Sequence, residues 1–212
     1  MKNKTKLKYS AMNKDFKLTE VKLKGKLKAQ IYDNCLPLNE FEEMQKQLLS
    51  SAFPYFYHKE IVEKEKYNIK SPVKGYGDNK DVDVCQFVHS FFDNERSIWS
   101  QYVNLIRPIL NVINPRAWIR VKGNLGIKEQ KHLVGGWHYD ILQQNGKPYD
   151  DTITGVLHLN TNNGYTLMET GQKVESVANR LVLFPCNVLH TNITHTDIKA
   201  RALLNFNFLA TT

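Results

Sequence analysis

The segment Arg201-Ala202-Leu203-Leu204-Asn205-Phe206-Asn207-Phe208 has the alternation of a β-strand. Successive side chains of a strand point to opposite faces of the sheet. One face of this segment is apolar and carries Ala202, Leu204, Phe206 and Phe208. The other face carries Arg201, Leu203, Asn205 and Asn207. The pattern predicts a strand that packs on a core with one face and meets a polar cavity or water with the other.

Short strand-like runs follow one another from Pro115 to this segment. They occupy 117–124, 136–142, 152–159, 164–168, 173–176, 180–184, 187–193 and 200–209. Turn signals such as Asn145-Gly146 and Gly171 separate them. Evenly spaced short strands predict a sandwich or a barrel in this half of the chain.

The N-terminal half is expected to supply helices. Apolar residues at helical spacing predict a first helix that ends before Pro54: Leu38, Phe41, Met44, Leu48 and Leu49. Asn39 and Glu42 resemble a capping box at its start. A second helix is expected over 95–113, kinked at Pro108. The chain is therefore predicted to be α+β and mainly β.

Between the two helices the pattern is less regular. Residues 54–58 are aromatic and are expected to be extended, and 84–92 can form a strand. Residues 65–84 are polar, contain Gly75 and Gly77, and are interpreted as a loop. Such loops often carry function, so this one is a candidate for substrate contacts.

The positive charge of the chain belongs to one end. Residues 1–28 contain ten lysines against Asp15 and Glu20, which accounts for the whole net charge of +8. Alternation from Val21 to Ile31 predicts a half-buried strand with lysines on its outer face, which protect a sheet edge. Residues 1–15 lack this period and are interpreted as a mobile tail. A nucleic-acid-binding arm is the less favoured alternative.

Length and composition favour one domain. The 212 residues hold no apolar run long enough to span a bilayer and begin with no secretory signal, so no membrane partner is expected. Three widely spaced cysteines favour neither a disulfide framework nor a zinc ribbon. A reducing, cytoplasmic setting is the simplest interpretation.

Three residues could together hold a metal. His138 and Asp140 in Gly136-Trp-His-Tyr-Asp140 would point to the same side of a strand, and His190 ends an apolar run. Two histidines and one carboxylate form the facial triad that holds non-haem Fe(II) and leaves positions open. The H-x-D pair alone is a weak signal.

Arg201 adds a feature that a metal alone does not require. Its guanidinium, flanked by apolar residues, is costly to bury unless it meets an anion, and its planar fork can bind a carboxylate through two hydrogen bonds. A metal with open positions and an arginine eleven residues after the last ligand suit a chelating keto acid.

The order H-x-D, His, Arg in a chain of short strands resembles the 2-oxoglutarate- and Fe(II)-dependent dioxygenases. It looks most like the prolyl-4-hydroxylase-like branch and its short members, which phages often encode. The resemblance covers about residues 30–212 and is strongest over 116–208, including Trp118 to Leu125, Gly155 to Gly164 and Phe184 to His190. It implies a double-stranded β-helix (jelly roll) backed by N-terminal helices on one face.

The resemblance also implies roles for individual residues. His138, Asp140 and His190 would hold Fe(II), and Arg201 would anchor the cosubstrate 2-oxoglutarate. Branch members often place a tyrosine before Leu-Asn to bond the cosubstrate, and here His158 stands at that position. Asn124 is a further candidate for the wall of the pocket, with Arg120 and Lys122 alternating on the same strand.

The implied reaction uses O2 and hydroxylates a substrate, by default a peptidyl proline, with release of succinate and CO2. The substrate could equally be another peptide or protein or a small molecule. The implied domain layout is a lysine-rich tail and edge strand over 1–28 and one domain over 29–212. That domain has helical support over 37–113 and a β core over 116–209. The setting would be the host cytoplasm for a phage protein.

Other histidines and other functions compete with this interpretation. His195 could replace His190 but lies in a Thr/Asp turn that suits a surface loop, and His58, His89 and His132 have no matching partners. Trp137 and Tyr139 are interpreted as packing residues, and Cys186 as an inert thiol. A zinc hydrolase would leave Arg201 unexplained. A non-catalytic jelly roll, such as a viral structural or binding protein, remains the main alternative.

Overall fold

The structure is a computed structural model and describes residues 7–61, 69–82 and 84–210. The described residues contain two α-helices, α1 (Leu38–Leu48) and α2 (Arg107–Ile113), both before the strand β6. Three short 3₁₀ helices accompany them: η1 (Tyr9–Ala11), η2 (Asn79–Asp81) and η3 (Gln101–Ile106). The strands are β1 (Lys17–Lys22), β2 (Lys28–Asp33), β3 (Phe56–His58), β4 (Gln86–Asp93), β5 (Ile98–Trp99), β6 (Ala117–Ile127), β7 (Thr152–His158), β8 (Asn162–Met168), β9 (Lys173–Ser176), β10 (Arg180–Pro185), β11 (His190–Ile193) and β12 (Ala200–Leu209).

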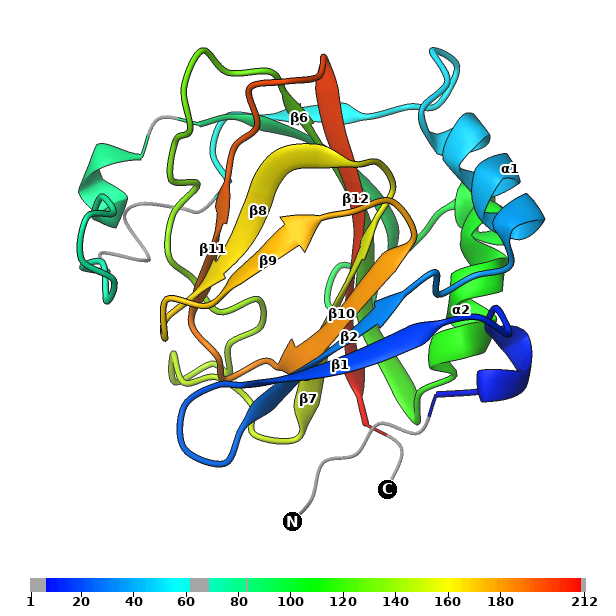
Figure 1. The fold of residues 1–212 in the computed structure, drawn as a ribbon, viewed down its shortest axis with the longest axis horizontal. Coiled ribbons are helices and arrows are strands. Elements are labelled where there is room, and N and C mark those ends of the chain that lie inside the picture. The colour runs from blue at the N-terminus through cyan, green and yellow to red at the C-terminus, as the bar shows by residue number, and fades with distance from the viewer. Residues whose placement is uncertain (1–6, 62–68, 83, 211–212) are drawn as a thin grey trace.

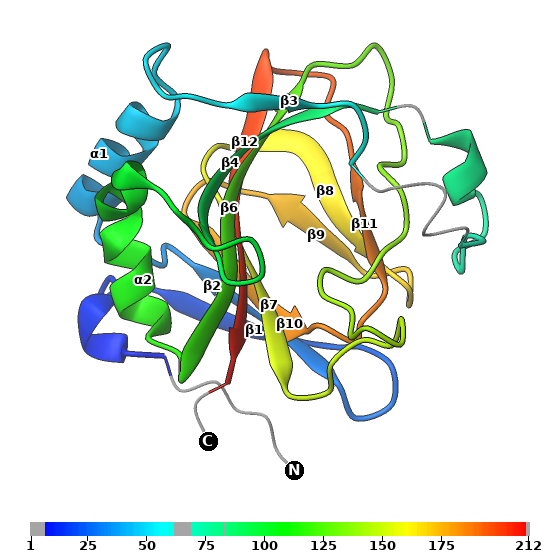
Figure 2. The same ribbon diagram turned by 180° about the vertical axis from the view of Figure 1, so that it is seen from behind.

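These strands form two antiparallel sheets. The large sheet has the order β1-β2-β10-β7-β12-β6-β4-β3, with β5 paired to β4, and the small sheet has the order β11-β8-β9. Figure 1 shows the small sheet in front of the large one, with both helices to the side. Seen from behind, the molecule is layered as helices, large sheet and small sheet (Figure 2). This is a double-stranded β-helix, the predicted fold class.

The outer face of the large sheet forms the main core with the helices. Strand β12 contributes Ala202, Leu204, Phe206 and Phe208, all with no exposed surface. Phe41, Met44 and Leu48 of α1 and Ile109, Val112 and Ile113 of α2 are buried in the same cluster. The prediction for this face of the strand is confirmed.

The inner face of the same strands is polar in its central part. On β12, Arg201, Asn205 and Asn207 are buried on this face, and on the paired strand β6 their partners are Gly126, Lys122 and Arg120. Residues paired across antiparallel strands point to the same side, so the two strands build one polar wall. The wall faces the space between the two sheets, as the alternation predicts.

Seven of the eight strand-like runs after Pro115 are strands, and 136–142 is not. That segment is irregular and makes isolated bridges, between His138 and His190 and between Leu142 and Pro148. Its start nevertheless lies beside β11, because the Gly135 N–H donates to the Asn192 carbonyl at 2.8 Å and His138 pairs with His190. A Cβ atom built on Gly135 would lie 1.7 Å from Asn192 Oδ1, so a side chain there would require the Asn192 side chain to move.

The alternation over 21–31 belongs to two strands and not to one. Strands β1 and β2 pair as a hairpin, with a turn at Gly25 in the left-handed region (φ +62°). The predicted lysine-bearing edge is real, because β1 ends the large sheet. The prediction of a tail over 1–15 is wrong for the described part, since Leu7 and Met12 are buried in the main core. Residues 1–6 lie outside the described residues.

Helix α1 differs in detail from its prediction. No side chain caps its start at Pro37, and Asn39 lies within the first turn, so the capping box does not form. Leu38 and Leu49 are exposed, at 61% and 39% of their surface. The buried face is narrower than the sequence suggested and consists of Phe41, Met44 and Leu48.

The predicted helix over 95–113 is divided. Residues 98–99 form β5, residues 101–106 form η3, and α2 begins only at Arg107 with Pro108 in its first turn. Proline suits this position because its missing N–H would be unpaired there in any case. The extended segment 54–58 contains β3, and 84–92 corresponds to β4.

The loop predicted over 65–84 is only partly described. Residues 69–82 contain η2 and no other regular element, and 65–68 and 83 lie outside the described residues.

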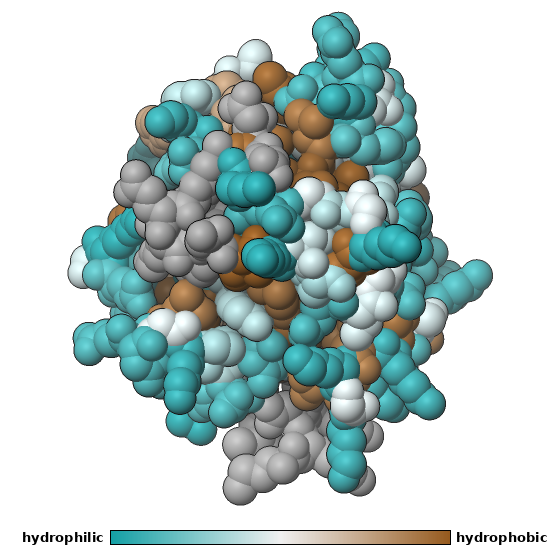
Figure 3. All heavy atoms as spheres, turned by 90° about the vertical axis from the view of Figure 1, so that its left-hand side faces the viewer, coloured by the Kyte–Doolittle hydropathy of each residue, from teal (hydrophilic) through white to brown (hydrophobic). Residues whose placement is uncertain are grey.

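No helix among the described residues is long and apolar enough to cross a membrane. On the side of the molecule in Figure 3, hydrophobic residues form small separate areas between hydrophilic ones.

Candidate metal centre

Backbone pairing brings His138 beside His190. The His138 N–H donates to the His190 carbonyl at 3.0 Å, and the His190 N–H donates to the His138 carbonyl at 3.2 Å. Trp137 fixes the same segment, because its backbone N–H and carbonyl both bond the Asn79 side chain, at 2.6 and 2.8 Å. Trp137 is completely buried with Leu167, Leu189 and Ile193, as expected of a packing residue.

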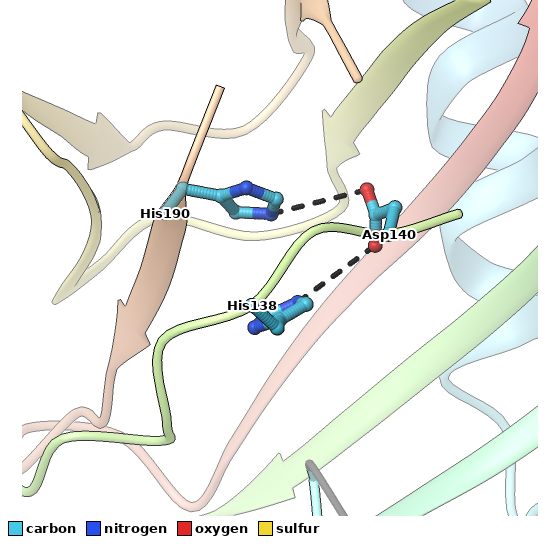
Figure 4. Close-up of side chains that lie close together, drawn as sticks. All are labelled: His138, Asp140 and His190. Carbon is cyan, nitrogen blue, oxygen red and sulfur yellow. Dashed lines mark ion pairs between the residues drawn. The ribbon is translucent and has the colours of Figure 1, made fainter. Parts of the chain in front are cut away.

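The side chains of His138, Asp140 and His190 converge on one point (Figure 4). His138 Nε2 lies 3.8 Å from Asp140 Oδ1, and His190 Nε2 lies 3.8 Å from Asp140 Oδ2. One possible ligand atom from each residue lies within 4.8 Å of those of the others. Within the described residues this is the one group of three or more such side chains close enough to share a metal ion.

The hydrogen bonds of the two imidazoles leave Nε2 free for a metal. His138 Nδ1 donates to the Gly136 carbonyl at 2.9 Å, and His190 Nδ1 donates to the Val188 carbonyl at 3.1 Å. A carbonyl can only accept, so Nε2 carries the lone pair when the ring is neutral. Burial and the neighbouring His190 lower the pKa of His138 to about 4, which keeps its ring neutral near pH 7.

Asp140 is buried in a network of donors. Its Oδ2 accepts from Thr154 Oγ1 at 2.8 Å and from Asn205 Nδ2 at 3.2 Å. Arg120 Nη2 lies 3.7 Å from Oδ1. Burial alone raises the pKa of Asp140, but His190, His138, Arg120 and Lys122 lower it by more, so the carboxyl lies below its usual range and is ionised.

These residues line a cavity of about 300 Å³ between the two sheets. Arg201 lies in its wall and is 4% exposed. Its Nη1 donates to the Ile193 carbonyl at 3.1 Å, but Nε and Nη2 are buried without a partner. Burial lowers the pKa of Arg201 to about 10, so the group is still a cation near neutral pH. A buried guanidinium with two free donors requires an anion.

The two weaker predicted contacts have different positions. Asn124 lines the cavity, and its buried Oδ1 has no partner. His158 points to the same inner face, opposite Leu203, but is not among the described residues that line the cavity. Both of its ring nitrogens are buried without a partner. Burial lowers its pKa well below the usual range, and Arg201 and Arg180 add to this effect.

His195 is not on a surface loop as predicted. It is 1% exposed, lines the same cavity, and has an unpartnered Nε2. It is absent from the metal-like group of the described residues, which contains His190. His89 bonds the Pro54 carbonyl and Ser100, His132 bonds the Thr194 carbonyl, and His58 is exposed.

Burial raises the pKa of the Cys186 thiol to about 11, in line with an inert thiol. Its Sγ lies 3.2 Å from Thr154 Oγ1. The roles of Thr154 and Asn79 were not predicted from the sequence. Thr154 alternates with Val156 and His158 on one strand, so the period of two could have placed it on the inner face. Nothing in the sequence links Asn79 to Trp137.

The arrangement fits a metal with open coordination positions. Two neutral imidazoles and one carboxylate are the donor set of non-haem Fe(II) sites. The backbone carbonyls and the Thr154 hydroxyl orient these ligands, as partners outside the ligand set do in metal sites. The free donors of Arg201 lie in the same cavity and suit the carboxylate of a second ligand.

No family model matches the chain, and no curated protein matches it. Among solved structures, it is similar to a prolyl hydroxylase from Trichoplax adhaerens in complex with a peptide fragment of the hypoxia-inducible factor oxygen degradation domain. The identity is 12%, the match covers 85% of this chain and 83% of that chain, and the TM-score is 0.52.

The chain is also similar to SnoN, the non-heme α-ketoglutarate-dependent epimerase from nogalamycin biosynthesis. The identity is 12%, the match covers 87% of this chain and 78% of that chain, and the TM-score is 0.52. At this identity the likeness concerns the fold. The chain therefore has the double-stranded β-helix fold found in a prolyl hydroxylase and in a non-heme α-ketoglutarate-dependent enzyme.

Proposed function

We propose that this protein is a 2-oxoglutarate- and Fe(II)-dependent oxygenase. The observation that carries the proposal is that one cavity contains both the His138–Asp140–His190 group and the buried guanidinium of Arg201. Two of the three nitrogens of that guanidinium, Nε and Nη2, have no partner. A metal site alone leaves Arg201 unexplained, and an anion site alone leaves the convergent histidines unexplained. A chelating dicarboxylate accounts for both.

The roles of the residues follow from their contacts. His138 and His190 would bind iron through Nε2, because Nδ1 of each is engaged with a backbone carbonyl. Asp140 would bind through the carboxylate that Thr154 and Asn205 orient. Arg201 would bind the distal carboxylate of 2-oxoglutarate through Nε and Nη2. Asn124 and His158 are proposed as further cosubstrate contacts, since both have buried polar atoms without partners.

Bound iron would supply the activation of O2, which is chemistry that no side chain here provides. The balanced reaction consumes 2-oxoglutarate, O2 and a substrate C–H bond and yields succinate, CO2 and a C–OH group. The chain itself contributes orientation of the partners and exclusion of water. The completely buried Trp137 behind the ligand segment and the two covering sheets suit that task.

Peptidyl proline is the proposed substrate. Its support is the fold similarity to a prolyl hydroxylase solved with a peptide fragment. We further propose that residues 29–212 act as one catalytic domain, to which residues 1–28 add an edge of the large sheet. A cytoplasmic setting belongs to the same proposal, and the free thiols of Cys35, Cys85 and Cys186 suit a reducing compartment.

An anaerobic titration with Fe(II) and 2-oxoglutarate tests the proposal. The expected result is a visible metal-to-ligand charge-transfer band that requires both additions. His138→Ala should abolish the band, and Arg201→Met should require much more 2-oxoglutarate to reach it. Circular dichroism of each variant controls for folding. Well-folded wild-type protein without a band would overturn the proposal and favour a binding or structural jelly roll.

A further inference from the structure

The inner face of β6 carries two cations, Arg120 and Lys122, that are neither proposed metal ligands nor the proposed cosubstrate anchor, although Arg120 Nη2 lies 3.7 Å from Asp140 Oδ1. Arg120 and Lys122 alternate on this strand and both line the cavity beside Asp140. Arg201 lies on β12 opposite Gly126, whereas Lys122 lies opposite Asn205 and Arg120 opposite Asn207. On β6, Lys122 and Arg120 therefore lie four and six residues before Gly126, the residue that pairs with the proposed cosubstrate anchor Arg201.

Two of the three guanidinium nitrogens of Arg120 are hydrogen-bonded within the protein. Its Nε donates to Asn207 Oδ1 at 3.2 Å, and its Nη2 donates to the Asp140 backbone carbonyl at 3.0 Å. Its third nitrogen, Nη1, makes no hydrogen bond to any part of the chain that the structure describes. These contacts fix the direction of the guanidinium and leave one donor for a ligand.

The charge of Lys122 is balanced even less by neighbouring groups than that of Arg120. It is half-buried and forms no ion pair with any residue within 7–61, 69–82 or 84–210. Burial and the neighbouring Arg120 lower its pKa to about 7, against the opposing influence of Asp140. An ammonium group in a low-dielectric wall beside a guanidinium is destabilised unless an anion approaches it.

The acidic residues of the cavity do not supply that anion. Of the described lining residues, the acids are Asp140 and Glu95. Asp140 is committed to the histidines and to its donors, and Glu95 is exposed at the rim. Arg96, also at the rim, lies 3.9 Å from Asp93. Asp93 also raises the pKa of Lys122, but it forms its ion pair with Arg96, and Asp140 forms one with Arg120. Among the described residues, Lys122 is therefore left without an ion-pair partner.

We propose that Arg120 and Lys122 bind a carboxylate of the substrate and so hold a neighbouring C–H bond toward the His138–Asp140–His190 group. This inference rests on the proposed function and names its substrate class: an anionic compound, not a neutral one. The cavity of about 300 Å³ must also take 2-oxoglutarate, and it lies at the small end of ligand pockets, which favours a compact substrate.

The carboxylate could belong to the reacting molecule itself or to an acidic side chain beside it in a peptide. Two matched pairs of probes distinguish these sources. One pair is N-acetyl-L-proline and N-acetyl-L-prolinamide, and the other is acetyl-prolyl-glutamyl amide and acetyl-prolyl-glutaminyl amide. Within each pair the members differ in charge and hardly in size.

The test is anaerobic calorimetric titration of each probe into full-length protein loaded with Fe(II) and 2-oxoglutarate. The variants are Lys122→Met, with Lys122→Gln as a second replacement in case the first fails to fold. Lys46→Met is the matched control, because Lys46 is exposed on α1, away from the cavity, and its loss changes the net charge equally. The charge-transfer band measures 2-oxoglutarate affinity in every sample.

The expected result is that the charged member of one pair binds at least about tenfold more tightly than its amide, as a charge-assisted contact predicts. Both Lys122 variants should lose this preference while their 2-oxoglutarate affinity is unchanged, and Lys46→Met should behave as wild type. Equal binding of charged and neutral probes would overturn the inference.

Two further outcomes separate the inference from the function beneath it. If the Lys122 variants weaken 2-oxoglutarate binding while Arg201→Met does not, Lys122 is the cosubstrate anchor. The inference is then wrong, and the oxygenase stands. If wild-type protein gives no charge-transfer band, the proposed function fails, and the inference fails with it.

Discussion

The two faces of the large sheet are built from the same strands and differ in chemistry along strand β12. On the outer face, Phe206 and Leu204 have no exposed surface and pack in the core with α1 and α2. On the inner face of the same strand, Asn205 and Arg201 are equally buried but polar, and they face the cavity. Successive residues of one strand thus alternate between packing in the core and lining the cavity.

The difference shows how this fold separates stability from chemistry. Apolar burial on the outer face provides the main driving force for folding. The inner face holds groups that are costly to bury, including the unpartnered Nε and Nη2 of Arg201. A bound ligand that pairs with these groups would offset the free-energy cost of burying them. Substitutions on the two faces should therefore have separable effects.

The largest effect is expected from Phe206→Ala. Removing a completely buried phenylalanine should lower the free energy of unfolding by about 3–5 kcal/mol. The matched substitution on the preceding residue, Asn205→Ala, removes a hydrogen bond to the charged Asp140 and should cost less, about 1.5–3 kcal/mol. Denaturant unfolding of both apoproteins measures the difference. Equal losses would contradict the division of the sheet into two faces.

An intermediate effect is expected from Thr154→Val, which sharpens the comparison on the inner face. The Thr154 hydroxyl donates to Asp140 Oδ2 at 2.8 Å, and losing such a partner typically lowers metal affinity about 10–100-fold. Thr154→Ser keeps the hydroxyl and should bind Fe(II) nearly as wild type does. Anaerobic Fe(II) titration measures both. Unchanged affinity in Thr154→Val would show that Thr154 does not orient the ligand.

The smallest effect is expected from Leu38→Ala on α1. Leu38 is 61% exposed, so its loss should change the free energy of unfolding by less than about 0.5 kcal/mol. Leu48 lies on the same helix and has no exposed surface. Leu48→Ala should therefore lower the free energy of unfolding by about 2–5 kcal/mol. Thermal unfolding of the pair checks which face of α1 covers the sheet. A large loss for Leu38→Ala would mean that the helix packs differently.

The alternation of β12 was enough to predict both its core face and its polar face, because a period of two is a direct consequence of strand geometry. The same rule failed over 21–31. A tight turn at Gly25 conserves the in-and-out alternation, so a hairpin and a single strand have the same pattern. Sequence periodicity reports which way side chains point and not whether the chain has reversed.

The site was predictable where it depends on short spacing and not where it depends on tertiary packing. His138 and Asp140 were placed together by their separation of two residues, although their segment is not a strand. His195 was misplaced because Thr and Asp neighbours indicate a turn, and a turn can still be buried against a sheet. Asn79 bonds Trp137 across 58 residues, which no local pattern can reveal.

The central claim is that one cavity holds both a metal and a dicarboxylate. Anomalous diffraction at the iron edge, from crystals prepared anaerobically with Fe(II) and 2-oxoglutarate, tests it most directly. We expect one iron peak bonded to His138 Nε2, Asp140 and His190 Nε2, with a cosubstrate carboxylate bonded to Arg201 Nε and Nη2. An iron peak elsewhere, or a dicarboxylate that leaves Arg201 unpartnered, would contradict it.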